Sequence, residues 1–150
     1  MTDLQTRIQQ RIKELEPETV ANRRHIHELA ELSNTEVDTS AFVEEKLREY
    51  GFEDIHRPTE FSVVAILDTG REGKKLALRA DLDALAVPES EENLAGPRVC
   101  RSRTPDKTCH ACGHDAHSAM LLTAAKVLLE VKEELCGMLY ICFEQGEERG

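Results

Sequence analysis

The chain has 150 residues, of which 40% are hydrophobic and 32% are charged, as is typical of a soluble globular domain. A net charge of −10 argues against binding to a nucleic-acid backbone, which requires clustered Lys and Arg. No apolar run approaches the roughly 18–20 residues of a membrane span. The first residues also lack the apolar core of a secretory signal. We therefore expect no nucleic-acid partner, no membrane partner and a cytoplasmic location.

The chain is predicted to begin with helices. Apolar residues recur at helical spacing between about residues 3 and 31, but Pro17 interrupts this range. Pro is tolerated in the first turn of a helix, so we expect two helices, the second of which begins near Pro17. A further helix is expected over residues 38–50, ending at Gly51, a residue type favoured just after a helix.

Strands and helices then alternate. Residues 61–67 and 74–82 read as strands joined by a Gly-rich turn, and residues 88–108 read as a polar loop. The apolar range 115–131 predicts a buried helix, and the continuous apolar run 137–143 predicts a strand covered on both faces. This order predicts an α/β fold with an at least partly parallel sheet. The chain ends directly after its last strand, so we expect it to be a fragment.

Three groups of chemically versatile residues stand near the ends of these elements. Asp81 and Asp83 close one strand, Glu147 and Glu148 follow another, and the segment CHACGHDAH (109–117) leads into the buried helix. Ligands of open α/β sheets bind outside the carboxyl ends of strands, so the two acidic pairs are candidates for one common site. Taken alone, each pair is more typical of a solvated loop or a turn.

The five cysteines, at positions 100, 109, 112, 136 and 142, are an odd number in a chain without a recognisable signal. Clustered cysteines in a reducing compartment more often bind metal or act in catalysis than form disulfides. The CHACGHDAH segment leaves several alternatives open. A closed structural zinc site would need a second CxxC-type pair. A thioredoxin-like redox pair would open a helix directly after a strand, whereas this segment follows a long polar loop. A Cys–His nucleophile pair is possible, but no other residue in the chain supports it.

An open metal site explains more of these residues. Gly113 permits a tight turn that aims Cys112 and His114 at one ion, and Asp115 suits the first turn of the following helix. Glu147 and Glu148 are adjacent on a loop, so one carboxylate can bind metal while its neighbour takes a proton from water. This arrangement predicts metal-assisted hydrolysis.

Four segments resemble a known family of metal-dependent amidohydrolases and peptidases, which includes aminoacylases, hippurate hydrolases, N-acetyldiaminopimelate deacetylases and auxin-conjugate hydrolases. In chain order they are RRHIHELAELSNTE (23–36), ALRADLDALAVPE (77–89), CHACGHDAHSAMLLTAAKVL (109–128) and FEQGEERG (143–150). The segment that contains CGHD is the most specific of them.

The resemblance implies a three-layer, zinc-peptidase-like catalytic domain with a mixed, largely parallel sheet. It implies two divalent metal ions, with zinc, manganese and cobalt as candidates, and Cys112, His114 and Glu148 as ligands. Glu147 would be the general base, and Asp83 the carboxylate that supports the site by orienting a ligand. The implied substrate is a small N-acyl amino acid or peptide, which is hydrolysed at its amide bond.

Members of this family are roughly 400 residues long, so residues 1–150 would form only the N-terminal part of the catalytic domain. The dimerisation domain, the rest of the catalytic domain and two histidine ligands would lie outside this chain. His25, His27 and His56 do not match those histidines. We therefore expect a homo-oligomeric full-length enzyme and negligible activity from the isolated 150 residues. The alternative hypothesis is a truncated, non-catalytic metal-binding or interaction module on the same scaffold.

Overall fold

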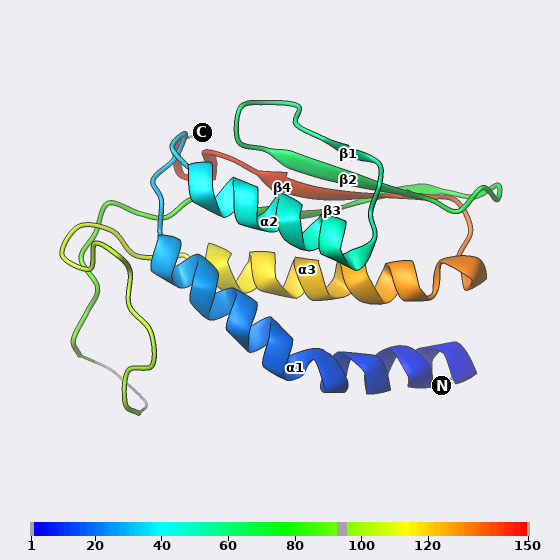
Figure 1. The fold of residues 1–150 in the computed structure, drawn as a ribbon, viewed down its shortest axis with the longest axis horizontal. Coiled ribbons are helices and arrows are strands. Elements are labelled where there is room, and N and C mark those ends of the chain that lie inside the picture. The colour runs from blue at the N-terminus through cyan, green and yellow to red at the C-terminus, as the bar shows by residue number, and fades with distance from the viewer. Residues whose placement is uncertain (1, 93–95, 150) are drawn as a thin grey trace.

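The computed structural model describes residues 2–92 and 96–149. Three helices, α1 (Asp3–Leu29), α2 (Val37–Tyr50) and α3 (His114–Glu130), accompany four strands, β1 (Ile55–His56), β2 (Val63–Asp68), β3 (Lys75–Asp81) and β4 (Met138–Glu144). Short 3-10 helices span Lys132–Glu134 and Glu147–Arg149. The three helices lie on one face of the sheet, with α2 and α3 nearer to it and α1 packed against α3 (Figure 1).

The sheet is mixed, and its strands follow the order β1-β2-β4-β3. The pairs β1–β2 and β2–β4 are antiparallel, and β3–β4 is parallel. The α/β class and the mixed sheet are therefore confirmed, but the sheet is not largely parallel within the described residues. The short connection between β2 and β3 makes these strands run in opposite directions. Because β4 inserts between them, it can be parallel to only one.

The apolar core lies between the sheet and the helices. Alternate side chains of β2 and β4 point towards the helices and are buried, and they include Val63, Ala65, Ile141 and Phe143. The side chains between them, on the opposite face, are partly buried or exposed. A three-layer arrangement would need helices on this second face, so the third layer stays a prediction.

Helix α1 is continuous from Asp3 to Leu29 and contains Pro17 in its interior, so the expectation of two separate helices was wrong. Proline removes one helical hydrogen bond and introduces a steric clash, which bends a helix without always ending it. Figure 1 shows that α1 changes direction about halfway along its length. Packing stabilises both halves: Leu15 lies in a buried position before the proline, and Ile26 in one after it.

The other helices and the three longer strands lie close to their predicted ranges. Helix α2 ends at Gly51, whose φ of 103° is the left-handed conformation expected after a helix. Helix α3 begins directly after Gly113, and the described parts of the 88–108 segment contain neither helix nor strand. No helix in the described ranges is both long and apolar enough to cross a membrane.

We expect Gly137→Ala to destabilise the fold strongly. Gly137 has a φ of 87°, and a Cβ there would collide with the carbonyl oxygen of Lys74, the residue immediately before β3. Left-handed strain of about 1–2 kcal/mol and overpacking of about 1–3 kcal/mol should add. The matched control is Gly70→Ala, where φ is 68° but no atom lies within 4 Å of the added Cβ. Thermal unfolding should show a clearly larger decrease in Tm for Gly137→Ala than for the control, and equal decreases would contradict this reading.

Candidate metal centre

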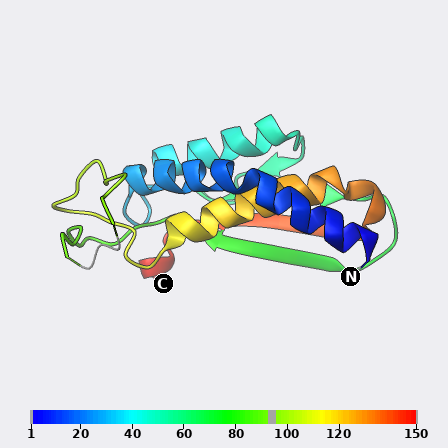
Figure 2. The ribbon, with the colours of Figure 1, turned by 90° about the horizontal axis from the view of Figure 1, so that it is seen from below.

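The predicted site residues come together at the carboxyl end of the parallel pair β3–β4. Asp81 is the last residue of β3 and lies opposite Glu144 in β4. The segments that follow these strands carry Asp83 and the Glu147–Glu148 pair, and the first residue of α3 is His114. Figure 2 shows the C-terminal 3-10 helix beside the N-terminal end of α3. The two acidic pairs, Asp81–Asp83 and Glu147–Glu148, therefore lie at the same edge of the sheet, as predicted.

His114 is the centre of this group and is buried, with 7% of its side chain exposed. Its Nδ1 donates a hydrogen bond to the main-chain oxygen of Asp83 at 2.9 Å. Its Nε2 lies 3.8 Å from Glu147 Oε2 and 3.9 Å from Glu148 Oε1. Because Nδ1 is held by this hydrogen bond, Nε2 is the ring nitrogen that faces the two carboxylates, which is the usual orientation of a metal-binding histidine.

Cys112 lies on the same turn, held by Gly113 with a φ of 81°. Its side chain is exposed and adjacent to Glu148. The neighbouring carboxylate of Glu148, together with the nearby charges of Glu147 and Asp83, raises the pKa of the Cys112 thiol. A divalent cation at this position would favour the thiolate instead.

Asp83 lies behind His114 and is almost fully buried. Its Oδ2 accepts hydrogen bonds from the Ser33 hydroxyl at 2.7 Å and from the main-chain N–H of Glu148 at 2.9 Å. Burial alone would raise the pKa of Asp83, but these hydrogen bonds and the proximity of His114 lower it. Asp83 thus contacts the elements that carry two of the predicted ligands.

The residues present are suited to a divalent metal. The buried atoms Asp83 Oδ1 and Glu148 Oε1 have no hydrogen-bond partner within the described residues, although an unpaired buried charge is costly. Metal ligands at about 2.0–2.3 Å from one ion lie roughly 3–4 Å from each other, and the separations from His114 Nε2 to the two glutamates fall in this range. Thiolate, imidazole and carboxylate together suit zinc and neighbouring divalent metals.

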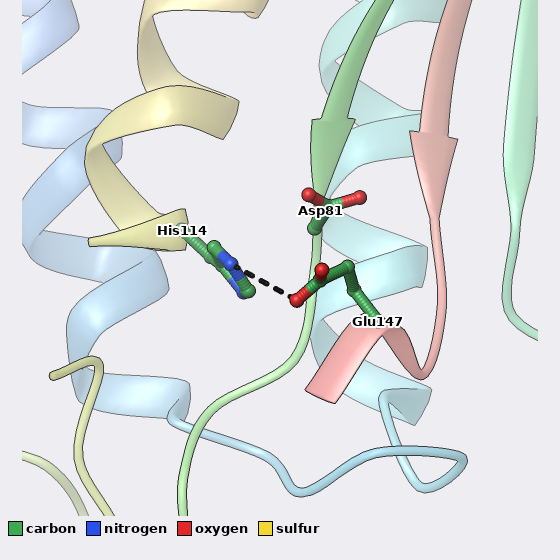
Figure 3. A group of neighbouring side chains, drawn as sticks. All are labelled: Asp81, His114 and Glu147. Atoms are coloured by element: carbon green, nitrogen blue, oxygen red, sulfur yellow. Dashed lines mark ion pairs between the residues drawn. The ribbon is translucent and has the colours of Figure 1, made fainter. Parts of the chain in front are cut away.

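Asp81 is a site residue that the sequence left undecided, because only Asp83 of the pair was given a role. One carboxylate oxygen of Asp81, one ring nitrogen of His114 and one oxygen of Glu147 lie within 4.8 Å of each other. Figure 3 shows these three side chains converging from β3, α3 and the segment after β4. Asp81 also accepts a hydrogen bond from Arg79 at 2.8 Å. The signal in the sequence was the DLD spacing itself, which does not reveal which carboxylate faces the site.

A second polar cluster lies behind the CGHD turn and joins it to α1. His27 is bound between Asp115 Oδ2, at 2.8 Å from Nδ1, and Glu89 Oε1, at 2.7 Å from Nε2. Arg23 also contacts Asp115, and Arg98 contacts Glu89. Because Asp115 directly follows His114, this cluster anchors the start of α3. The sequence motifs assign no role to His27, which matches none of the histidines expected for the family.

Cys109 and His110 of the CHACGHDAH segment lie apart from the group formed by Asp81, His114 and Glu147. Cys109 and His110 are buried, and both ring nitrogens of His110 lack a partner within the described residues. Burial lowers the pKa of His110 to about 4, so its ring is neutral near pH 7. All five cysteines are free thiols, so neither a disulfide nor a second cysteine pair is formed.

The stability of the folded state should depend on the charge of His27. The hydrogen bond to Asp115 raises the pKa of His27. Burial alone would lower this pKa, but the hydrogen bond to Glu89 raises it further. Protonated His27 therefore stabilises the fold fully below its unfolded pKa of about 6.5. This contribution is lost as the pH rises through the raised folded value. We expect His27→Gln to lower Tm most at pH 6 and progressively less towards pH 9.

The control for this measurement is His56→Gln, which removes an exposed histidine. Its effect on Tm should be small throughout the pH series. A Tm difference between the wild type and His27→Gln that is constant from pH 6 to pH 9 would contradict the charge-dependent role of His27.

Comparison with known proteins identifies the class to which this fold and site correspond. Residues 77–150 match the model of the peptidase family M20/M25/M40. The chain is 39% identical over 141 residues to an N-acyl-L-amino acid amidohydrolase of Geobacillus stearothermophilus, covering 94% of the chain and 36% of that protein. A hippurate hydrolase of Campylobacter jejuni is 37% identical over 137 residues, covering 91% of the chain and 34% of that protein.

A solved structure agrees with these relatives. A dinuclear metal-binding peptidase of the M20 family from Bacillus subtilis superimposes with a TM-score of 0.80 and 33% identity, over 91% of this chain and 37% of that one. The family predicted from the sequence motifs is therefore confirmed: the chain is related to the metal-dependent amidohydrolases and peptidases of the M20 family. It spans about a third of the length of these relatives.

Proposed function

We propose that the whole protein is a metal-dependent hydrolase that cleaves the amide bond of N-acyl amino acids. The observation that carries this proposal is the free Nε2 of buried His114, which faces Glu147 and Glu148 at 3.8 and 3.9 Å. The relatives named as an N-acyl-L-amino acid amidohydrolase and a hippurate hydrolase support this substrate class.

Cys112, His114 and Glu148 are the proposed metal ligands from this chain. Their thiolate, imidazole and carboxylate groups are compatible with zinc, manganese or cobalt. Two ions per subunit are proposed, because the related structure from Bacillus subtilis is described as dinuclear. A bound metal ion would lower the pKa of a water molecule and polarise the carbonyl group of the scissile amide.

Glu147 is the proposed general base. Its side chain is 42% exposed, whereas that of Glu148 is 18% exposed, so Glu147 is the more accessible of the two to substrate and water. The carboxylate of Glu147 would take a proton from water as the water oxygen bonds to the amide carbon. Returning this proton to the departing nitrogen breaks the C–N bond and gives a carboxylate and a free amine.

Asp83 is proposed to orient the ligands rather than to touch the substrate. Its main-chain oxygen holds Nδ1 of His114, and its carboxylate holds the N–H of Glu148. These two contacts fix the direction in which both ligands present their metal-binding atoms.

The setting of the whole protein is also a proposal. We propose that residues 1–150 form the N-terminal part of a catalytic domain, with a dimerisation domain, further ligands and a third layer supplied elsewhere in a homo-oligomer. The coverage of about a third of each relative supports this view. A cytoplasmic location is proposed because the five cysteines are free.

The test is hydrolysis by the full-length protein of a panel that contains N-acetyl amino acids, N-benzoyl amino acids and unblocked dipeptides. Release of the free amino acid can be followed by its reaction with an amine reagent. Hydrolysis of the acylated compounds in preference to the dipeptides is the expected result. Hydrolysis of the dipeptides alone would redirect the proposal towards peptidase activity, and the absence of any turnover with metal bound would contradict it.

A further inference from the structure

The turn that joins α1 to α2 contacts the segment that carries Glu147 and Glu148. Glu36 on this turn is fully buried, with 0% of its surface exposed. Its Oε1 accepts a hydrogen bond from the main-chain N–H of Gly146 at 2.8 Å, and its Oε2 has no partner within the described residues. Burial raises the pKa of Glu36. Burial of a carboxyl group that lacks a full set of hydrogen bonds costs folding free energy. We therefore ask what the contact with Gly146 contributes.

The same turn shapes the main chain immediately before the two glutamates. Gly146 has a φ of 70°, and a Cβ added there would collide with the Asn34 side chain. The Asn34 side chain also accepts a hydrogen bond from Gln145 Nε2 at 2.8 Å. Gln145 is further held through its Oε1, which accepts the N–H of Phe61 at 2.6 Å. The chain at residues 145 and 146 is therefore fixed on two sides.

Ser33, three residues before Glu36, reaches the same segment through Asp83. The Ser33 hydroxyl donates to Asp83 Oδ2 at 2.7 Å, and this oxygen also accepts the main-chain N–H of Glu148 at 2.9 Å. Glu36 and Ser33 thus act on the main chain on either side of Glu147. They lie more than 100 residues away from it in the sequence.

We propose that Glu36 and Ser33 are positioning residues, which hold the main chain of residues 146–148 so that the carboxylates of Glu147 and Glu148 face His114. This inference rests on the proposed function, because it assigns Glu147 and Glu148 to the reaction and to metal binding. A displacement of reacting groups by about 1 Å can reduce a rate by about 10²-fold. Loss of these hydrogen bonds should therefore reduce kcat, although neither residue touches the substrate.

The first experiment compares Glu36→Gln with Glu36→Met in the full-length, metal-loaded protein. Glutamine keeps the acceptor oxygen for Gly146, whereas methionine has a similar volume but no such acceptor. We expect Glu36→Gln to retain kcat within about threefold and Glu36→Met to lower it by about 10- to 100-fold, with little change in KM. Equal kcat values for the two variants, measured per metal-loaded site, would overturn the proposal, even if Glu36→Met lowers Tm.

Ser33→Ala is the second variant, with Thr35→Ala as its matched control. Thr35 is exposed on the same turn, and its hydroxyl donates a local hydrogen bond to the main-chain oxygen of Leu32. Ser33→Ala should lower kcat and Thr35→Ala should leave it unchanged. Equal effects of the two substitutions would show that the turn matters only for folding.

Metal binding gives a readout that does not depend on turnover. Titration with Co²⁺, followed by its visible absorption, should show weaker binding to Glu36→Met than to Glu36→Gln, because Glu148 would be displaced. If the wild type binds Co²⁺ but hydrolyses no N-acyl amino acid, the proposed function fails while this comparison still tests the positioning role. Identical Co²⁺ affinities of both variants would overturn the positioning role itself.

Discussion

Replacing Glu147 by glutamine is expected to lower kcat for N-acyl amino acid hydrolysis by about 10²- to 10⁴-fold, the usual contribution of a general base. The amide is nearly isosteric with the carboxylate but cannot accept a proton at neutral pH. The main chain of the loop is held by contacts to neighbouring residues, including the N–H of Glu148 to Asp83. The substitution should therefore leave the fold and the metal content unchanged.

The matched control is Glu133→Gln, because Glu133 lies at the opposite end of β4 and has 86% of its side chain exposed. This variant should behave like the wild type in kcat, KM and metal content. If Glu147→Gln retained near wild-type kcat, the base would have to be another group. If Glu147→Gln lost metal instead, Glu147 would be a ligand, as its distance of 3.8 Å from His114 Nε2 also permits.

The second large effect is expected from Cys112→Ala and His114→Gln, which should each abolish or strongly weaken binding of at least one metal ion. Partners that only orient a ligand cost about 10- to 100-fold in metal affinity when removed, so loss of a direct ligand should cost more. His114 is the more severe case, since it is buried and hydrogen-bonded to Asp83. Metal content per subunit after dialysis, measured by elemental analysis, checks both variants.

Cys136→Ser and His56→Gln are the corresponding controls, because both side chains are exposed and stand outside the site. They should keep the wild-type metal content. Retention of two tightly bound ions per subunit by Cys112→Ala would show that this thiol is not a ligand, even if the variant were less active.

Local sequence patterns predicted the elements that carry the site. The apolar run of β4, the buried helix α3 and the glycine before His114 were all readable, since each depends on neighbours along the chain. The meeting of the Asp81–Asp83 segment with Glu147 and Glu148 followed from one general rule about the carboxyl ends of parallel strands. Family resemblance then assigned separate roles to Glu147 and Glu148, which remain to be tested.

Other features depend on contacts that no local pattern contains. Pro17 resembles a helix start, but the helix continues through it and has buried residues on both sides of the proline. The insertion of β4 between β2 and β3 is a long-range pairing. Glu36 stands in a polar stretch typical of an exposed turn, and its burial follows from the approach of Gly146. The contacts of His27 are hidden for the same reason, because its partners Glu89 and Asp115 are distant in sequence.

The most direct test of the central claim is removal and restoration of metal in the full-length protein. Dialysis against a chelator should abolish hydrolysis of an N-acyl amino acid, and addition of zinc, manganese or cobalt should restore it as two ions bind per subunit. The His114→Gln variant should not recover under the same conditions. Full activity of the metal-free protein, or recovery of His114→Gln to the wild-type rate, would contradict a metal-dependent reaction at this site.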